Sequence, residues 1–127
     1  MARILVVEDT PSNVQLARLV LEQAGHEVLL ASDAPSGLEL ARGAHPDLIL
    51  MDVQLPGMDG MSATRQLKQD PQTHDIPVLA LTAFAMKGDA EKIRAAGCDA
   101  YLAKPFNFKE LLEMIQRLLP QGSASPH

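Results

Sequence analysis

The sequence predicts an α/β domain in which a doubly wound, five-stranded parallel sheet is covered by helices on both faces. Two observations predict this class. Five short apolar segments recur along the 127 residues, and segments with helical periodicity separate them. Because each short segment is almost continuously apolar, it suits burial on both of its faces, which is typical of strands in a parallel sheet.

The expected strands are rich in Val, Ile, Leu and Ala and lack internal Gly. They are RILVVE (3–8), EVLLA (27–31), DLILM (47–51), PVLALT (77–82) and AYLA (100–103). Gly- and Pro-containing stretches separate them from the preceding helices, at Gly25, 43–47, 70–77 and 95–100. The chain therefore alternates strand and helix from end to end.

The intervening segments have the spacing of amphipathic helices. Their apolar positions are Val14, Ala17, Leu21 and Ala24, then Leu38 and Ala41, then Ile93 and Ala96, and in the last helix Phe108, Leu111, Leu112, Ile115 and Leu118. The segment between Met61 and Gln69 has the weakest stripe, formed by Met61, Thr64 and Leu67.

Composition restricts the class of function. The chain fits one domain over residues 1–119, followed by a small and polar tail at 120–127 that we expect to be disordered. A net charge of −5 without a Lys/Arg run argues against direct nucleic-acid binding. No apolar run approaches the roughly 20 residues of a membrane-spanning helix, so we expect a cytoplasmic protein that does not associate with membranes.

Cysteine and histidine offer no site in the sequence. Cys98 is the only cysteine, which excludes an internal disulfide. The four histidines, His26, His45, His74 and His127, are too scattered in sequence to suggest a zinc cluster.

Polar side chains stand where four of the expected strands end. They are Glu8 and Asp9 after the first strand, Asp52 after the third, Thr82 at the end of the fourth, and Lys104 with Pro105 after the fifth. Each alone is also typical of a helix cap or a surface position. Ligands of open α/β sheets bind beyond the carboxyl ends of the strands, so we expect the set to meet at one rim.

The chemistry of this set favours a phosphoryl group. Three carboxylates on one rim repel one another unless a cation holds them, and Mg²⁺ suits such oxygen ligands while also accepting phosphate oxygens. Lys104 adds a positive charge, and Thr82 adds a hydroxyl donor. A carboxylate can accept a phosphoryl group as an acyl phosphate, and Asp52, central in the set, is the predicted acceptor.

Two other α/β classes fit these residues poorly. A flavodoxin-like mononucleotide binder needs a hydroxyl- and amide-rich phosphate loop after its first strand, where this chain has Glu8 and Asp9. A phosphatase of the haloacid dehalogenase type needs a D-x-D motif at its nucleophile, and DVQ at 52–54 lacks the second acid.

The motifs resemble the receiver domains of two-component response regulators. ILVVED, DLILMDVQLPGMDG, VLALTA and YLAKPF are similar to the blocks of that family, occur in its order, and cover residues 3 to about 119. TAFAMKGD (82–89) and GCDAYLAKP (97–105) are most similar to stand-alone, single-domain regulators of the CheY-like and DivK-like kind. The resemblance implies the CheY-like, flavodoxin-like fold, with strand order 2-1-3-4-5 and five helices.

The resemblance also implies roles for individual residues. Asp52 would take a phosphoryl group from a histidine kinase or a histidine phosphotransfer protein. Mg²⁺ would be held by Asp9, Asp52 and the backbone carbonyl of Gln54, with Glu8 acting through water. Lys104 would contact the phosphoryl oxygens.

The family implies a conformational switch as well. Thr82 would move to the phosphoryl group and Tyr101 would turn inward, changing the face of the fourth helix, fifth strand and fifth helix, roughly residues 84–119. The bond before Pro105 would be cis, which is uncommon for X-Pro bonds at about 5% overall.

Two positions depart from the commonest family sequence. Glu8 replaces the more frequent first Asp of the acidic pair, a variant expected to reach the metal through water. Phe84 is apolar where many members carry a polar residue, and with Gln54 it would limit access of the hydrolytic water. The resemblance therefore predicts slow self-dephosphorylation.

We expect a phosphorylation-driven signalling protein, monomeric or dimerising on phosphorylation, that binds a downstream protein target. It would be no enzyme beyond Mg²⁺-dependent self-phosphorylation and self-dephosphorylation. Two alternatives stay open: a phosphorylation-independent docking module with the same fold, and a Mg²⁺-dependent phosphohydrolase, for which the sequence offers no separate general base.

Overall fold

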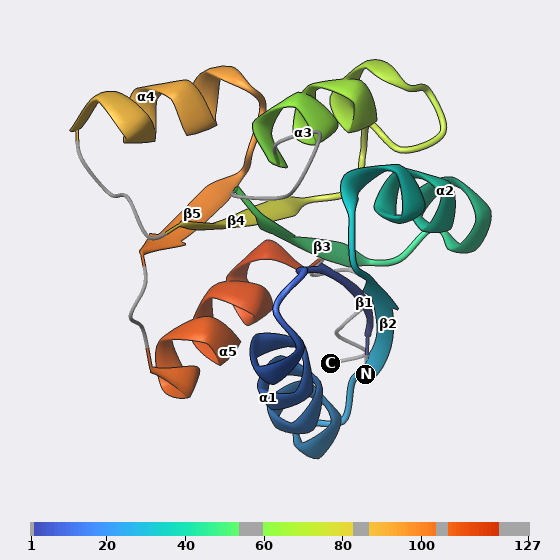
Figure 1. Ribbon diagram of the computed structural model, residues 1–127, viewed down its shortest axis with the longest axis vertical. Helices are drawn as coiled ribbons and strands as arrows, with labels where there is room; N and C mark the ends of the chain where they lie inside the picture. Colours follow the sequence, from blue (N-terminus) through green and yellow to red (C-terminus); the bar gives the residue numbers. More distant parts are fainter. Residues whose placement is uncertain (1, 54–59, 83–86, 104–106, 120–127) are drawn as a thin grey trace.

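The computed structural model describes residues 2–53, 60–82, 87–103 and 107–119. Within them five strands alternate with five helices, as Figure 1 shows. The strands are β1 (Arg3–Val7), β2 (Glu27–Ala31), β3 (Leu48–Asp52), β4 (Val78–Thr82) and β5 (Ala100–Ala103). The helices are α1 (Pro11–Gln23), α2 (Ala34–Ala44), α3 (Gly60–Gln69), α4 (Lys87–Ala95) and α5 (Phe108–Leu118). The predicted elements are confirmed, with strand boundaries shifted by at most one residue.

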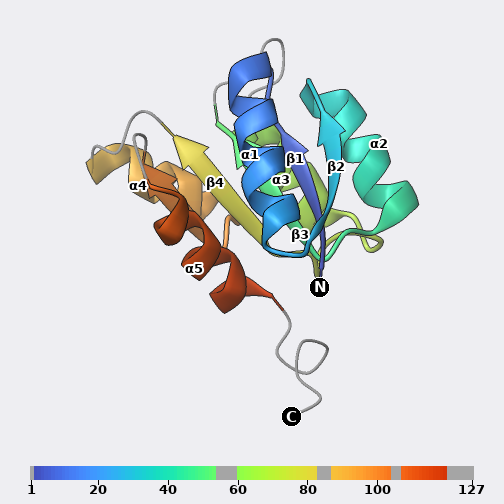
Figure 2. The same cartoon turned by 90° about the horizontal axis from the view of Figure 1, so that it is seen from below.

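The sheet is parallel throughout, in the order β2-β1-β3-β4-β5, which confirms the predicted topology. In Figure 2 the arrowheads of β2 and β4 point to the same edge of the sheet, opposite the N-terminus. The strand order reverses between β1 and β3. Ligands of such sheets bind beyond the carboxyl ends of the strands at this reversal, and there Glu8 follows β1 while Asp52 ends β3.

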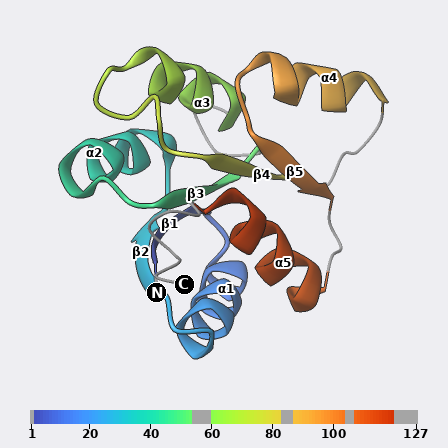
Figure 3. The same ribbon diagram turned by 180° about the vertical axis from the view of Figure 1, so that it is seen from behind.

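Two apolar layers hold the helices on the sheet. Alternate side chains of each strand point to opposite faces, so Val6 and Leu50 join one core cluster and Val7 and Met51 join the other. The cluster of Val6 and Leu50 also includes Leu111 and Ile115 of α5. The cluster of Val7 and Met51 includes residues of α2 and α3. Figures 1 and 3 show the same division, with α1 and α5 on one face and α2, α3 and α4 on the other.

The helices bury less of their predicted stripes than expected at two places. Leu21 is the one fully buried residue of α1, while Val14 and Ala17 are partly buried and Ala24 is exposed at the helix end. Phe108, at the start of α5, is 38% exposed. Ala24 and Phe108 lie at helix ends, where a regular apolar spacing has less sheet to cover. The rest of the α5 stripe packs as predicted, around Leu111 and Ile115.

Within the described residues, no helix combines the length and the apolar character needed to cross a lipid bilayer. The predicted tail at 120–127 lies outside the described residues.

Candidate phosphorylation and metal site

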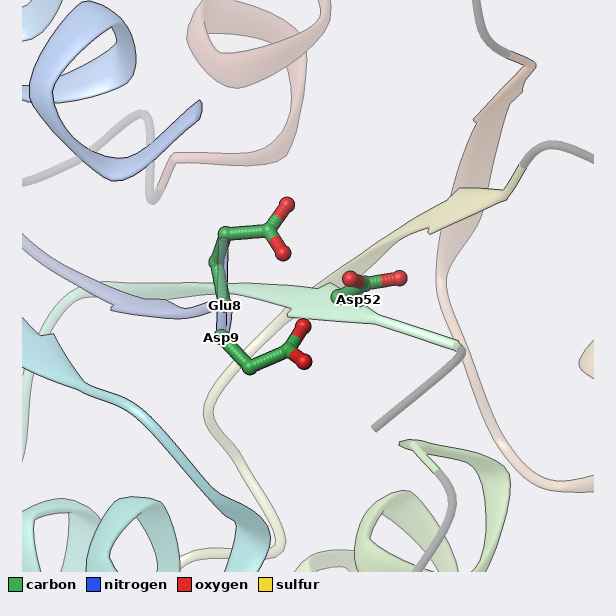
Figure 4. Close-up of side chains that lie close together, drawn as sticks. All are labelled: Glu8, Asp9 and Asp52. Carbon is green, nitrogen blue, oxygen red and sulfur yellow. The ribbon is translucent and has the colours of Figure 1, made fainter. Parts of the chain in front are cut away.

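Three carboxylates meet at the carboxyl edge of the central strands. One oxygen from each of Glu8, Asp9 and Asp52 lies within 4.8 Å of the others, and Figure 4 shows the three side chains together beside the end of β3. The pairing of β1 with β3 produces this meeting, because Val7 lies opposite Met51 and the next residue of each strand is Glu8 or Asp52. The sequence prediction that these residues share a rim therefore agrees with the structure.

The site lies mostly below the surface. Glu8 and Asp52 are each only 3% exposed, whereas Asp9 is exposed. Burying a carboxylate is costly unless donors or a cation compensate it. Asp9 therefore forms the solvent side of the site, and Glu8 and Asp52 form its floor.

Glu8 is held on three sides. Its backbone N–H donates to the carbonyl of Ala31 at 3.0 Å, which extends the pairing of β1 with β2 by one step. The backbone N–H of Thr10 donates to Glu8 Oε2 at 3.2 Å, and the side-chain amide of Asn13 lies 3.4 Å from Glu8 Oε1. The sheet fixes the backbone of Glu8, and the loop and the first turn of α1 hold its carboxylate.

The donor set suits a hard divalent cation. Oxygen ligands from carboxylates are those that Mg²⁺ prefers, and Mg²⁺ also keeps several waters in its shell. Asp9, which is exposed, is open to such waters. Among the described residues, this is the one group of three His, Cys, Asp or Glu side chains close enough together to hold a metal ion.

Thr82 lies at the same rim, one strand away. It is the last residue of β4, directly after Leu81, which pairs with Asp52. The residue is 1% exposed and is therefore buried at the edge of the sheet. On its other side Thr82 pairs with Ala103, the last residue of β5. The residue after Ala103 is Lys104, which lies outside the described residues.

Four further predicted residues fall in two groups. Gln54, Phe84 and Pro105 lie outside the described residues, so their predicted roles stay predictions. Tyr101 is described: it is half-buried on β5, opposite Ala80 of β4. Its role as a switch also stays a prediction.

Gly60, at the start of α3, lies close against the backbone of Asp52 and Val53, an approach that was not predicted from the sequence. Its backbone N–H donates to the carbonyl of Val53 at 3.0 Å. A Cβ atom on Gly60 would collide with the backbone oxygen of Asp52 and would come within 2.9 Å of Val53 Cα. Only Gly allows α3 to begin this close to the end of β3. Its place one residue before the helical segment expected from Met61 onward was a usable sequence clue.

Cys98 takes no part in this site. It is half-buried, and its thiol lies 3.7 Å from the hydroxyl of Thr64 on α3. Burial raises the pKa of the Cys98 thiol above its ordinary value, which disfavours the reactive thiolate.

Comparison with known proteins agrees with this geometry. The family described as "Response regulator receiver domain" matches residues 4–116. The polar-differentiation response regulator DivK of Brucella ovis is 46% identical over 116 residues, which cover 91% of this chain and 94% of that protein.

Solved structures give the same result. The receiver domain of the sensor histidine kinase PA1611 of Pseudomonas aeruginosa holds a magnesium ion coordinated in its active site cleft; it is 40% identical, with a TM-score of 0.86, over 92% of this chain and 96% of that one. The chemotaxis protein CheY4 of Vibrio cholerae is 34% identical, with a TM-score of 0.89, over 94% of this chain and 99% of that one. The chain therefore belongs to the response regulator receiver domain family and functions in two-component signal transduction.

Proposed function

We propose that Asp52 is the phosphoacceptor of this receiver domain. The observation that carries the proposal is the meeting of Glu8, Asp9 and Asp52 within 4.8 Å at the point where the strand order reverses. Family membership implies a histidine kinase or a histidine phosphotransfer protein as the phosphoryl donor. Asp52 ends β3, a central strand whose residues are all buried, so the sheet fixes the position of its backbone.

The residues of the site would have separate roles in phosphoryl transfer and in metal binding. An oxygen of Asp52 forms a bond to phosphorus while the bond between phosphorus and the donor imidazole breaks, which leaves an acyl phosphate and a free histidine. Asp9, Asp52 and the Gln54 carbonyl would hold Mg²⁺, with Glu8 reaching it through water. When bound, Mg²⁺ neutralises charge on the phosphoryl oxygens. Lys104 and Thr82 would contact those oxygens directly.

Signalling would follow from a shift between two packings of the same fold. Thr82 would hydrogen-bond the phosphoryl group and Tyr101 would turn inward, which changes the surface formed by α4, β5 and α5. Couplings of this kind are typically about 1–3 kcal/mol. The output would be contact with a downstream protein in the cytoplasm, by a monomer or by a dimer that forms on phosphorylation, without direct nucleic-acid binding.

The phosphorylated state is expected to be long-lived. Hydrolysis requires a water molecule that attacks phosphorus and releases phosphate from Asp52, and an apolar Phe84 would neither bind nor orient that water. Decay of the phosphorylated protein, followed by the loss of the added mass, is expected to take minutes or longer. Phe84→Asn or Phe84→Glu should shorten it, and a native lifetime of seconds would contradict the prediction.

Acetyl phosphate tests the proposal without the natural donor. The protein is incubated with Mg²⁺ and acetyl phosphate and its intact mass is measured beside that of Asp52→Asn. One added phosphoryl group on the native protein alone supports the proposal. No adduct on either protein supports the phosphorylation-independent docking module, and steady turnover of varied phosphoesters supports the phosphohydrolase.

A further inference from the structure

Asn13 contacts the acidic site from a helix that contributes no predicted ligand. It lies in the first turn of α1, and its side-chain nitrogen is 3.4 Å from Glu8 Oε1. The backbone N–H of Thr10 binds the other oxygen, Oε2, at 3.2 Å. We propose that Asn13 is a positioning residue that orients the Glu8 carboxylate toward the metal site and so sets its affinity for Mg²⁺. The proposal rests on the metal site of the proposed function.

Glu8 needs such a restraint because of its length. A Glu side chain has one more rotatable bond than Asp, so its carboxylate is held less firmly by the backbone alone. Glu8 is only 3% exposed, and a buried carboxylate requires hydrogen-bond donors. Donors on both oxygens fix the rotation of the group.

The chemistry of position 13 also fits this role. The first turn of α1 contains no acidic residue, although acids are favoured there by the helix dipole. An acid at position 13 would add a fourth negative charge next to Glu8, whereas the Asn amide donates without charge. The N-cap residue of α1, Thr10, makes no side-chain cap bond, so Asn13 does not complete a capping box with it. The amide of Asn13 serves the carboxylate and not the helix end.

Groups that support a metal ligand typically change metal affinity by about 10- to 100-fold when removed. Asn13→Ala is therefore expected to weaken Mg²⁺ binding to the unphosphorylated protein by about tenfold, measured by isothermal titration calorimetry. Gln15→Ala is the matched control, because it removes an exposed amide from the same helix. Its dissociation constant should equal that of the native protein.

A double-mutant cycle separates positioning from a general effect on α1. Glu8→Asp shortens the side chain beyond the reach of Asn13, so adding Asn13→Ala to it should weaken Mg²⁺ binding no further. In the metal-free protein, the side-chain amide resonances of Asn13 should shift in Glu8→Asp while those of Gln15 stay in place. An unchanged Mg²⁺ affinity in Asn13→Ala, or an equal loss in both backgrounds, would overturn the proposal.

These readouts are independent of phosphorylation. If acetyl phosphate leaves Asp52 unmodified and the cycle still shows coupling, only the phosphoacceptor assignment fails. If Asp52 is phosphorylated and the cycle shows no coupling, only the role of Asn13 fails.

Discussion

Asp52→Asn is expected to stabilise the metal-free protein, although it removes the proposed functional group. Asp52 and Glu8 are each 3% exposed and share a cluster with Asp9 whose oxygens lie within 4.8 Å of one another. Two like charges about 5 Å apart repel by roughly 3 kcal/mol at an effective dielectric constant of about 20. The hydrogen-bond donors on Glu8 offset part of this, so we expect a net gain of about 1–2 kcal/mol, or several degrees in Tm.

The same substitution should weaken the stabilisation of the protein by magnesium. A ligand that binds only the folded state stabilises it by about 2.7 kcal/mol at 100 times its Kd. Thermal unfolding of the native protein should therefore shift upward on addition of Mg²⁺, and that of Asp52→Asn should shift much less. If Asp52→Asn lowers the Tm of the metal-free protein, or keeps the full magnesium shift, the carboxylates do not form one mutually repelling metal site.

Gly60→Ala is expected to damage both the fold and the site. The new methyl group would collide with the backbone oxygen of Asp52 and lie 2.9 Å from Val53 Cα. These are backbone atoms at the end of a central strand, so the helix must move away from them. Overpacking of this kind costs about 1–3 kcal/mol or more. The bond from the Gly60 N–H to Val53 would be strained or lost, and Asp52 would be phosphorylated more slowly by acetyl phosphate.

Gly43→Ala provides the matched control. Gly43 lies inside α2, and a Cβ there meets nothing within 4 Å. Because Ala is favoured over Gly in a helix by roughly 0.5–1 kcal/mol, this variant should be slightly more stable than the native protein. Chemical denaturation of the two variants compares them directly. Equal stability of Gly60→Ala and Gly43→Ala would show that α3 does not need its close approach to β3.

The strands could be predicted from sequence because burial on both faces requires an almost continuous run of apolar residues. Residues of β3 and β4 are all buried, so almost every position in them is apolar. The helix α3 was harder to predict, since its stripe is short. It is held by tertiary contacts: Ala63 and Leu67 enter the core, and the Thr64 hydroxyl donates to the carbonyl of Gly60 at 2.8 Å.

The site residues that lie at strand ends could be predicted from the sheet topology. The residues that reach the site from neighbouring helices could not. Glu8 and Asp52 follow from the rule that carboxyl ends of parallel strands share an edge. Asn13 does not follow, because an Asn in a first helical turn is ordinary and its bond to Glu8 exists only once α1 is docked. Gly60 is similar, since the need for Gly arises from a backbone approach between elements that the sequence does not place in space.

Asp52 is the residue proposed to carry the phosphoryl group, and the roles proposed for Thr82, Tyr101 and Lys104 all depend on it. An acyl phosphate of aspartate is reduced by borohydride to homoserine, which marks the modified position for peptide sequencing by mass spectrometry. After treatment with Mg²⁺ and a phosphoryl donor, homoserine is expected at position 52. Homoserine at Asp9, the equivalent product at Glu8, or no reduced residue at all would contradict the account.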